Sequence, residues 1–148
     1  METKHIEVRN RIDNFLKESQ EARNARKERL RTYFAEDEET LITYEDLLTY
    51  EVGERIEVND AVTFEKIYQD ANRMTFLTYM LDGGGFGMHK HNCYEVTKIL
   101  KGNLFERSKT GLRVYKEGEE IIYGKNELHK PYATMDSTYE VTFLRKLF

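Results

Sequence analysis

The chain has 148 residues, the usual length of a single domain and enough to bury a hydrophobic core. Hydrophobic residues make up 39% and charged residues 34%, which excludes a membrane-embedded protein; the ten Tyr and eight Phe argue against disorder throughout. The 23 basic and 27 acidic residues give a net charge of −4, so composition indicates neither nucleic-acid nor membrane partners. A single cysteine, Cys93, and a polar N-terminus without a secretory signal predict a reducing, cytoplasmic location.

Residues 1–38 are predicted to form a charged helical arm. Neither Gly nor Pro occurs before Gly53, and residues 7–34 are rich in good helix formers. The apolar positions are too sparse for a coiled coil, which needs apolar residues over several heptads. Two interpretations stay open: a surface helix that packs against the rest of the chain, or an arm that docks a partner or a second copy.

Residues 39–148 are predicted to form a mainly β domain. Short segments rich in β-branched and aromatic residues alternate there with turn signals. A β-prone stretch at 40–44 precedes a turn or short helix at 45–48, and Gly111 ends a hairpin turn that begins at Ser108. Further strands are expected at 55–58, 72–81, 94–100, 103–107, 112–115, 120–122 and 138–147. Many short strands at this spacing are typical of a β-sandwich or β-barrel.

The residue types that carry chemistry gather between Gly83 and Gly102. His89 and His91 are separated by one residue, and on a strand they would project from the same face because alternate side chains do. Glu95 keeps the same parity. Imidazole and carboxylate ligands suit borderline divalent metals such as iron, manganese, nickel and zinc. The segment therefore predicts a metal site, to which His129 would be added if returning strands bring it near.

The spacing of this segment resembles the first sequence motif of the cupins, G(X)5HXH(X)3–4E(X)6G. The chain matches it at every defined position, reading Gly83-x5-His89-x-His91-x3-Glu95-x6-Gly102.

The second cupin motif, G(X)5PXG(X)2H(X)3N, is matched in part. Gly118 and His129 occupy its first glycine and its histidine at the right spacing. Gly124 stands at the usual proline, Asn126 at the second glycine and Ala133 at the final asparagine. Asn tolerates positive φ better than most residues, so the turn is expected to survive. None of these departures removes a metal ligand of the family.

The resemblance implies a jelly-roll or conical β-barrel that holds one divalent transition metal (Fe, Mn, Ni or Zn). Its protein ligands would be His89, His91, Glu95 and His129. Such a set leaves coordination positions open for a small-molecule ligand, as catalytic sites do. A homodimer is the expected assembly, since two-fold dimers are the commonest oligomers.

The resemblance does not decide the function, because one fold hosts many activities. The first interpretation is an enzyme of dioxygenase, isomerase or lyase type. The second is a non-catalytic module that senses a ligand or a metal and works through the N-terminal helix, and the third uses the metal to hold the fold together.

Two further groups of residues have open roles. Cys93 shares the parity of the metal ligands, yet a free cysteine usually behaves as a small buried hydrophobe. Several tyrosines are candidates for the wall of a ligand cavity, although such residues more often belong to the strand core: Tyr79, Tyr94, Tyr115, Tyr123, Tyr132 and Tyr139.

Overall fold

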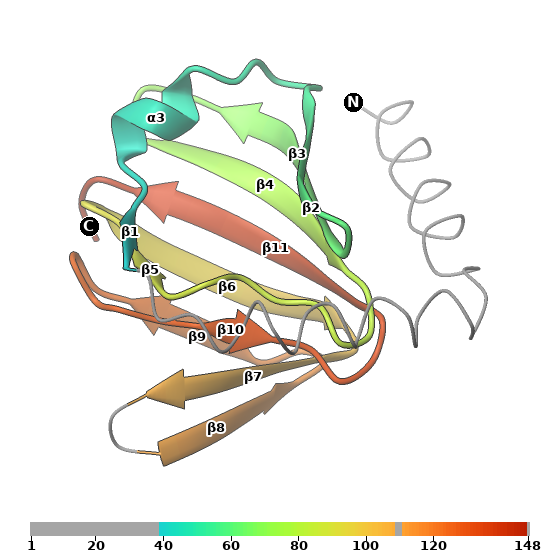
Figure 1. Ribbon diagram of the computed structural model, residues 1–148. Coiled ribbons are helices and arrows are strands. Elements are labelled where there is room, and N and C mark those ends of the chain that lie inside the picture. Colours follow the sequence, from blue (N-terminus) through green and yellow to red (C-terminus); the bar gives the residue numbers. More distant parts are fainter. Residues whose placement is uncertain (1–38, 109–110, 148) are drawn as a thin grey trace.

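The computed structural model describes residues 39–108 and 111–147, and the predicted arm at residues 1–38 lies outside this part of the chain (Figure 1). The described chain is mainly β, as the sequence predicts. Its elements are β1 (Thr40–Leu41), α3 (Tyr44–Leu48), β2 (Arg55–Asn59), β3 (Val62–Gln69), β4 (Arg73–Met80), β5 (His89–Lys90), β6 (Tyr94–Lys101), β7 (Asn103–Ser108), β8 (Gly111–Lys116), β9 (Glu120–Tyr123), β10 (Pro131–Tyr132) and β11 (Ser137–Leu144). No helix in this part of the chain is long and apolar enough to cross a membrane.

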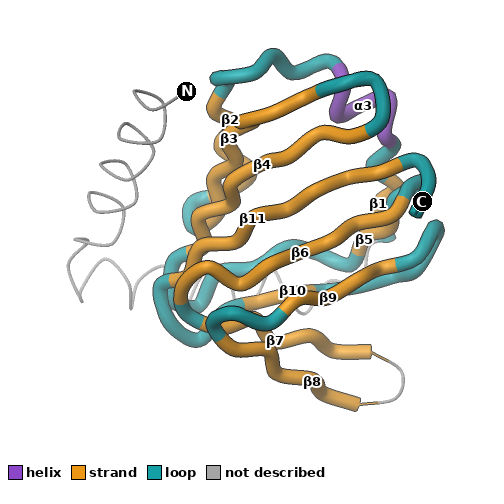
Figure 2. The backbone as a smooth tube through the Cα atoms, turned by 180° about the vertical axis from the view of Figure 1, so that it is seen from behind, coloured by secondary structure: helices purple, strands orange, loops and turns teal. Residues whose placement is uncertain are grey.

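The strands form one large sheet and two small ones. The large sheet has the order β2-β3-β4-β11-β6-β9, the second has the order β10-β7-β8, and all their pairs are antiparallel. The third sheet pairs β1 with β5 in parallel. Figures 1 and 2 show the large sheet curving so that one face is turned toward β5 and β10. The interior of the fold lies between these layers.

Strand β4 shows how the sequence builds the interior. Met74, Phe76 and Met80 alternate along it and belong to the main hydrophobic core, while Leu77 and Tyr79 form a separate cluster. A strand turns successive side chains to opposite faces, so the alternation places the first set inside. The same alternation on β6 and β11 brings inward-facing side chains together over the middle of the large sheet.

Two sequence expectations need correction. Strand β3 was not predicted, because Glu65 and Lys66 in its centre read as polar although both are buried. The β-prone stretch at 40–44 forms a strand only over Thr40–Leu41. Thr43 instead caps the N-terminus of α3, where its side chain accepts a hydrogen bond from Asp46 N at 3.1 Å. The helix at 45–48 and the hairpin that joins β7 to β8 are confirmed.

A buried lysine joins α3 to the large sheet. The Lys66 ammonium donates to the carbonyl oxygens of Leu47 at 3.1 Å and Tyr50 at 2.7 Å, and it lies 5.7 Å from the centroid of the Phe76 ring. Burial lowers its pKa. Because Leu47 and Tyr50 also line the internal cavity, this contact positions one wall of the cavity.

We expect the substitution Lys66→Met to lower the free energy of unfolding by about 3 kcal/mol, because it leaves two carbonyl oxygens without their charged donor. Urea unfolding measures the change. Lys98→Met is the matched control, since Lys98 is exposed on β6, and it should change stability by less than about 0.5 kcal/mol. Equal effects of the two substitutions would show that the buried ammonium does not hold α3.

Candidate metal centre

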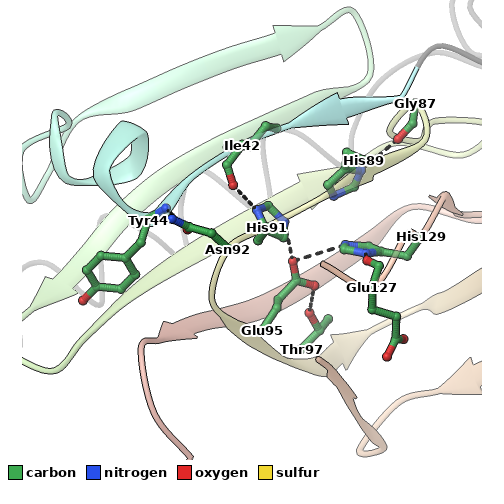
Figure 3. Close-up of polar contacts among 10 residues, drawn as sticks. All are labelled: Ile42, Tyr44, Gly87, His89, His91, Asn92, Glu95, Thr97, Glu127 and His129. Atoms are coloured by element: carbon green, nitrogen blue, oxygen red, sulfur yellow. Dashed lines mark hydrogen bonds and ion pairs between the residues drawn. The ribbon is translucent and has the colours of Figure 1, made fainter. Parts of the chain in front are cut away.

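Four buried side chains meet inside the described barrel: His89, His91, Glu95 and His129. Each offers one ligand atom, and these atoms all lie within 4.8 Å of one another. Figure 3 shows the imidazoles of His91 and His129 turned toward the Glu95 carboxylate, with His89 beside them. The structure thus brings together all four residues that the sequence analysis proposed as metal ligands. Such a group can bind a metal.

A backbone bridge places His129 beside His89. His89 N donates to His129 O at 3.0 Å, and His129 N donates to His89 O at 2.9 Å. The two ring centroids are 4.1 Å apart. The pairing continues on one side as Phe86 N donates to Pro131 O at 3.0 Å. The returning strand that the sequence analysis expected is therefore a short antiparallel ladder beside β5.

The strand at the start of the described chain orients His91. Strand β1 pairs in parallel with β5, and Ile42 N donates to Lys90 O at 3.0 Å. The carbonyl of Ile42 then accepts a hydrogen bond from Nδ1 of His91 at 2.8 Å. Nearby, Asn92 Oδ1 accepts from Tyr44 N at 2.7 Å, which joins α3 to the loop that carries His91. Sequence reasoning missed this role of Ile42, because nothing local links it to the histidine.

The three imidazoles share one hydrogen-bond arrangement. In each ring Nδ1 contacts a backbone carbonyl oxygen, which can only accept, so Nδ1 carries the proton and a neutral ring keeps its lone pair on Nε2. The pairs are His89 with Gly87 O at 2.8 Å, His91 with Ile42 O at 2.8 Å and His129 with Glu127 O at 2.9 Å. This is the arrangement of metal-binding histidines, whose second ring nitrogen is held by an outer partner.

The Glu95 carboxylate has one oxygen engaged by the protein and one turned to the rings. Thr97 Oγ1 donates to Glu95 Oε2 at 2.8 Å. Oε1 lies 3.1 Å from His91 Nε2 and 3.5 Å from His129 Nε2, yet neither nitrogen makes a hydrogen bond of acceptable geometry within the described residues. Lone pairs on two nitrogens and an oxygen therefore face one another. A cation among them removes that repulsion, so the donor set fits a divalent metal.

Burial and the neighbouring groups set the charge of the cluster. Burial, reinforced by His129, lowers the pKa of His89 to about 3, which keeps that ring neutral. Burial opposes ionisation of Glu95, but His129 and His91 together hold its pKa well below the usual value. Burial also disfavours the charged form of His129, and the Glu95 carboxylate outweighs it and raises the pKa. The Glu95 carboxylate therefore attracts positive charge, whether a proton on His129 or a bound cation.

Aromatic rings hold the imidazoles from the side. Tyr123 on β9 stacks on His129 with centroids 4.0 Å apart and planes at 12°. Phe143 on β11 meets His91 edge-on at 4.9 Å, and Phe86 packs on His89 at 5.4 Å. Rings fixed by packing and by Nδ1 have little freedom to turn, so the ligand atoms are positioned in advance.

A cavity of about 390 Å³ adjoins the cluster, and His89, His91 and Glu95 lie in its wall. Its remaining walls come from the inner face of the large sheet and from α3. Among the predicted tyrosines, Tyr123 and Tyr139 line it, and so does Tyr50, which the sequence analysis did not name. Tyr79 belongs to a separate cluster.

The turn before His129 tolerates its unusual residues. Asn126 adopts φ +61° where the cupin motif has glycine, and its N–H donates to His91 O at 2.7 Å. The turn therefore survives as expected, and it adds a direct contact to the His91 segment. Cys93 is buried in the main core, and burial raises the pKa of its thiol to about 12. It lies outside the group of four described residues that could hold a metal ion.

Comparisons with known proteins identify the fold. No family model matches the chain, and no curated protein is similar to it in sequence. An RmlC-like cupin from Shewanella frigidimarina is similar in structure, with 14% sequence identity, a TM-score of 0.57, and coverage of 64% of this chain and 85% of that one. KdgF from Halomonas sp. has 14% identity and a TM-score of 0.58, with coverage of 64% of this chain and 89% of that one. A cupin-2 domain-containing protein from Shewanella frigidimarina has 19% identity and a TM-score of 0.52, with coverage of 70% of this chain and 94% of that one. The described chain has the cupin fold, as the motifs imply.

The hydrogen-bond arrangement predicts the protonation of the three imidazoles. In metal-free protein at pH 8.5, long-range proton–nitrogen NMR spectra should show His89, His91 and His129 with the proton on Nδ1. The two nitrogen shifts of each ring distinguish the tautomers directly. His5, the remaining histidine of the chain, provides the reference nitrogen shifts with which the three rings are compared. An Nε2-protonated ring at any of the three positions would contradict the arrangement.

Proposed function

We propose that this chain is a metal-dependent cupin that binds one divalent transition metal (Fe, Mn, Ni or Zn) and acts on a small molecule in the adjoining cavity. The metal ligands are His89, His91, Glu95 and His129. The observation that carries the proposal is the convergence of imidazole Nε2 atoms and a carboxylate oxygen that are not hydrogen-bonded to one another, beside a cavity. Homodimerisation and a cytoplasmic location stay predictions from the sequence.

The metal ligands and the apolar cavity wall have different roles at this site. A bound divalent metal supplies Lewis-acid polarisation or activation of dioxygen. The neutral imidazoles leave the charge of the metal only partly balanced by Glu95, which keeps it attractive to an oxygen donor. Apolar side chains on the inner face of the large sheet, among them Phe143 and Val141, exclude water from the ligand.

The lining favours dioxygenase over isomerase or lyase chemistry. Isomerases and lyases need a positioned proton donor or acceptor. Among the described residues that line the cavity, the carboxyl group besides Glu95 is that of Asp46, which accepts a hydrogen bond from Thr43 N at 2.9 Å in the cap of α3. Tyr139 donates its hydroxyl to Asn103 O. Tyr50 and Tyr123 also line the cavity, and burial raises the pKa of the Tyr123 hydroxyl, which makes it a weak proton donor. With so few groups for proton transfer, chemistry supplied by the metal fits this lining best.

Elemental mass spectrometry of the purified protein should find about one equivalent of a transition metal. The double substitution His89→Ala/His129→Ala should abolish it, and His5→Ala should not. Removing the metal with a chelator should lower the thermal midpoint, because a ligand of the folded state stabilises it. Iron would support the dioxygenase class, whereas zinc would direct assays to isomerases and lyases. Protein that stays metal-free after reconstitution would refute the proposal.

Thr97 is expected to act on the metal through Glu95. The substitution Thr97→Val removes the hydrogen bond to Oε2, and we expect metal affinity to fall by about tenfold to a hundredfold. Competition with a chromophoric chelator measures the affinity. Thr142→Val is the matched control, because Thr142 Oγ1 is hydrogen-bonded to Thr75 Oγ1 at 3.0 Å, away from the metal ligands. An equal loss in both variants would indicate a general effect on the sheet.

A further inference from the structure

We propose that the cavity takes a small, mainly apolar molecule with at most one negative charge, whose polar group at the end distant from the metal ligands hydrogen-bonds to Thr78 Oγ1. The metal-binding end of this ligand rests on the proposed function above. The apolar cavity and Thr78 do not depend on it.

The lining determines the polarity and charge of the ligand. Most of the wall is apolar, formed by aliphatic and aromatic side chains such as Ile56, Phe64, Met80, Val141 and Phe143. Among the described residues no lysine or arginine lines the cavity, and its carboxylates are Glu95 and Asp46. A phosphate or a dicarboxylate would bring charge into this space without a side-chain counterion, which is strongly unfavourable. A sugar would leave most of its hydroxyl groups without partners.

Thr78 provides a buried hydroxyl that the protein does not use. Its side chain is 0% exposed, it lines the cavity, and Oγ1 has no hydrogen-bond partner in the described chain. Two other hydroxyls of the lining are engaged, since Thr97 donates to Glu95 and Tyr139 donates to the Asn103 carbonyl. The unpartnered hydroxyl of Tyr123 belongs to the ring that stacks on His129, at the metal-binding end. Because an unpaired buried hydroxyl costs free energy, its presence in a ligand cavity indicates a ligand partner.

The register of the sheet places Thr78 far from the metal ligands. Thr78 on β4 pairs with Tyr139 on β11, which pairs with Ile99 on β6, four residues along the strand from Glu95. At about 3.3 Å per residue and 4.8 Å per strand, the backbones of Thr78 and Glu95 lie roughly 16 Å apart. A ligand that reaches both needs two polar ends separated by an apolar body. A cavity of about 390 Å³ is near the lower limit of ligand pockets, so this body is small.

Hydroxamic acids test the proposal, since one metal-binding head can carry different tails. Isothermal titration of zinc-loaded protein measures the affinity for hydroxamic acids with methyl, phenyl and biphenyl tails. The phenyl and biphenyl compounds are each tested with and without a terminal hydroxyl. A further compound, 4-phosphonophenyl hydroxamic acid, carries a charged group at that end. We expect an aryl tail to raise affinity at least tenfold over methyl, and the terminal hydroxyl to raise it about fivefold further at one of the two lengths. The phosphonate should bind more weakly than the phenyl compound.

The substitution Thr78→Val should remove the gain from the terminal hydroxyl and keep the gain from the aryl tail. The thermal midpoint should stay unchanged or rise, because no hydrogen bond within the protein is lost. Thr138→Val is the matched control: Thr138 is also buried with an unpartnered Oγ1, but it does not line the cavity. It should leave every affinity unchanged.

Equal binding of the methyl and aryl compounds, tight binding of the phosphonate, or a hydroxyl gain that survives Thr78→Val would each overturn the proposal. A separate probe, 4-phenylphenol, has no metal-binding head and is titrated into metal-free protein. If it binds to the wild type and binds more weakly to Thr78→Val while the protein takes up no metal, the proposed function fails and the inference about the cavity stands. If it does not bind, the inference about the cavity is wrong whatever the metal content.

Discussion

The backbone bridge between His89 and His129 is the constraint on which the site depends. Its two hydrogen bonds tie the segment after β4 to the segment before β10, and they bring together side chains that the chain order keeps far apart. A bridge made by the backbone is independent of the side chains it positions. The same contact that closes this side of the barrel therefore also sets the spacing of the imidazoles.

Backbone carbonyls then determine what the imidazoles can do. With Nδ1 of His91 held by Ile42 O, the lone pair of Nε2 has one direction left, toward Glu95. When the rings are neutral, their Nε2 lone pairs and the Glu95 carboxylate repel one another. A positive charge offsets this repulsion, either a proton on His129, whose pKa Glu95 raises, or a metal ion.

Sequence reasoning identified the four residues that converge because they lie on motifs with fixed spacing. It also expected the turn at Asn126 to survive, because asparagine tolerates the positive φ that the residue adopts. It did not predict β3, since the buried charge of Lys66 is satisfied by the carbonyls of Leu47 in α3 and Tyr50 just after it, both distant in sequence. The roles of Ile42 O and Thr78 were also hidden. Both follow from the pairing of strands that are far apart in sequence, and no local pattern encodes such a pairing.

The cavity and the cluster of three histidines and Glu95 have different chemistry, and the difference constrains the ligand. Near Glu95 the wall offers charge and lone pairs, while the inner faces of β4 and β11 offer mainly hydrocarbon. Electrostatic attraction is strong in such an apolar surrounding, so a metal held there would be the dominant attraction for any oxygen donor that enters. Many small molecules carry such an oxygen donor, so attraction to the metal alone would not distinguish among them. Discrimination among them has to come from the shape of the apolar wall and from Thr78, the buried hydroxyl with no hydrogen-bond partner in the described protein at the other end.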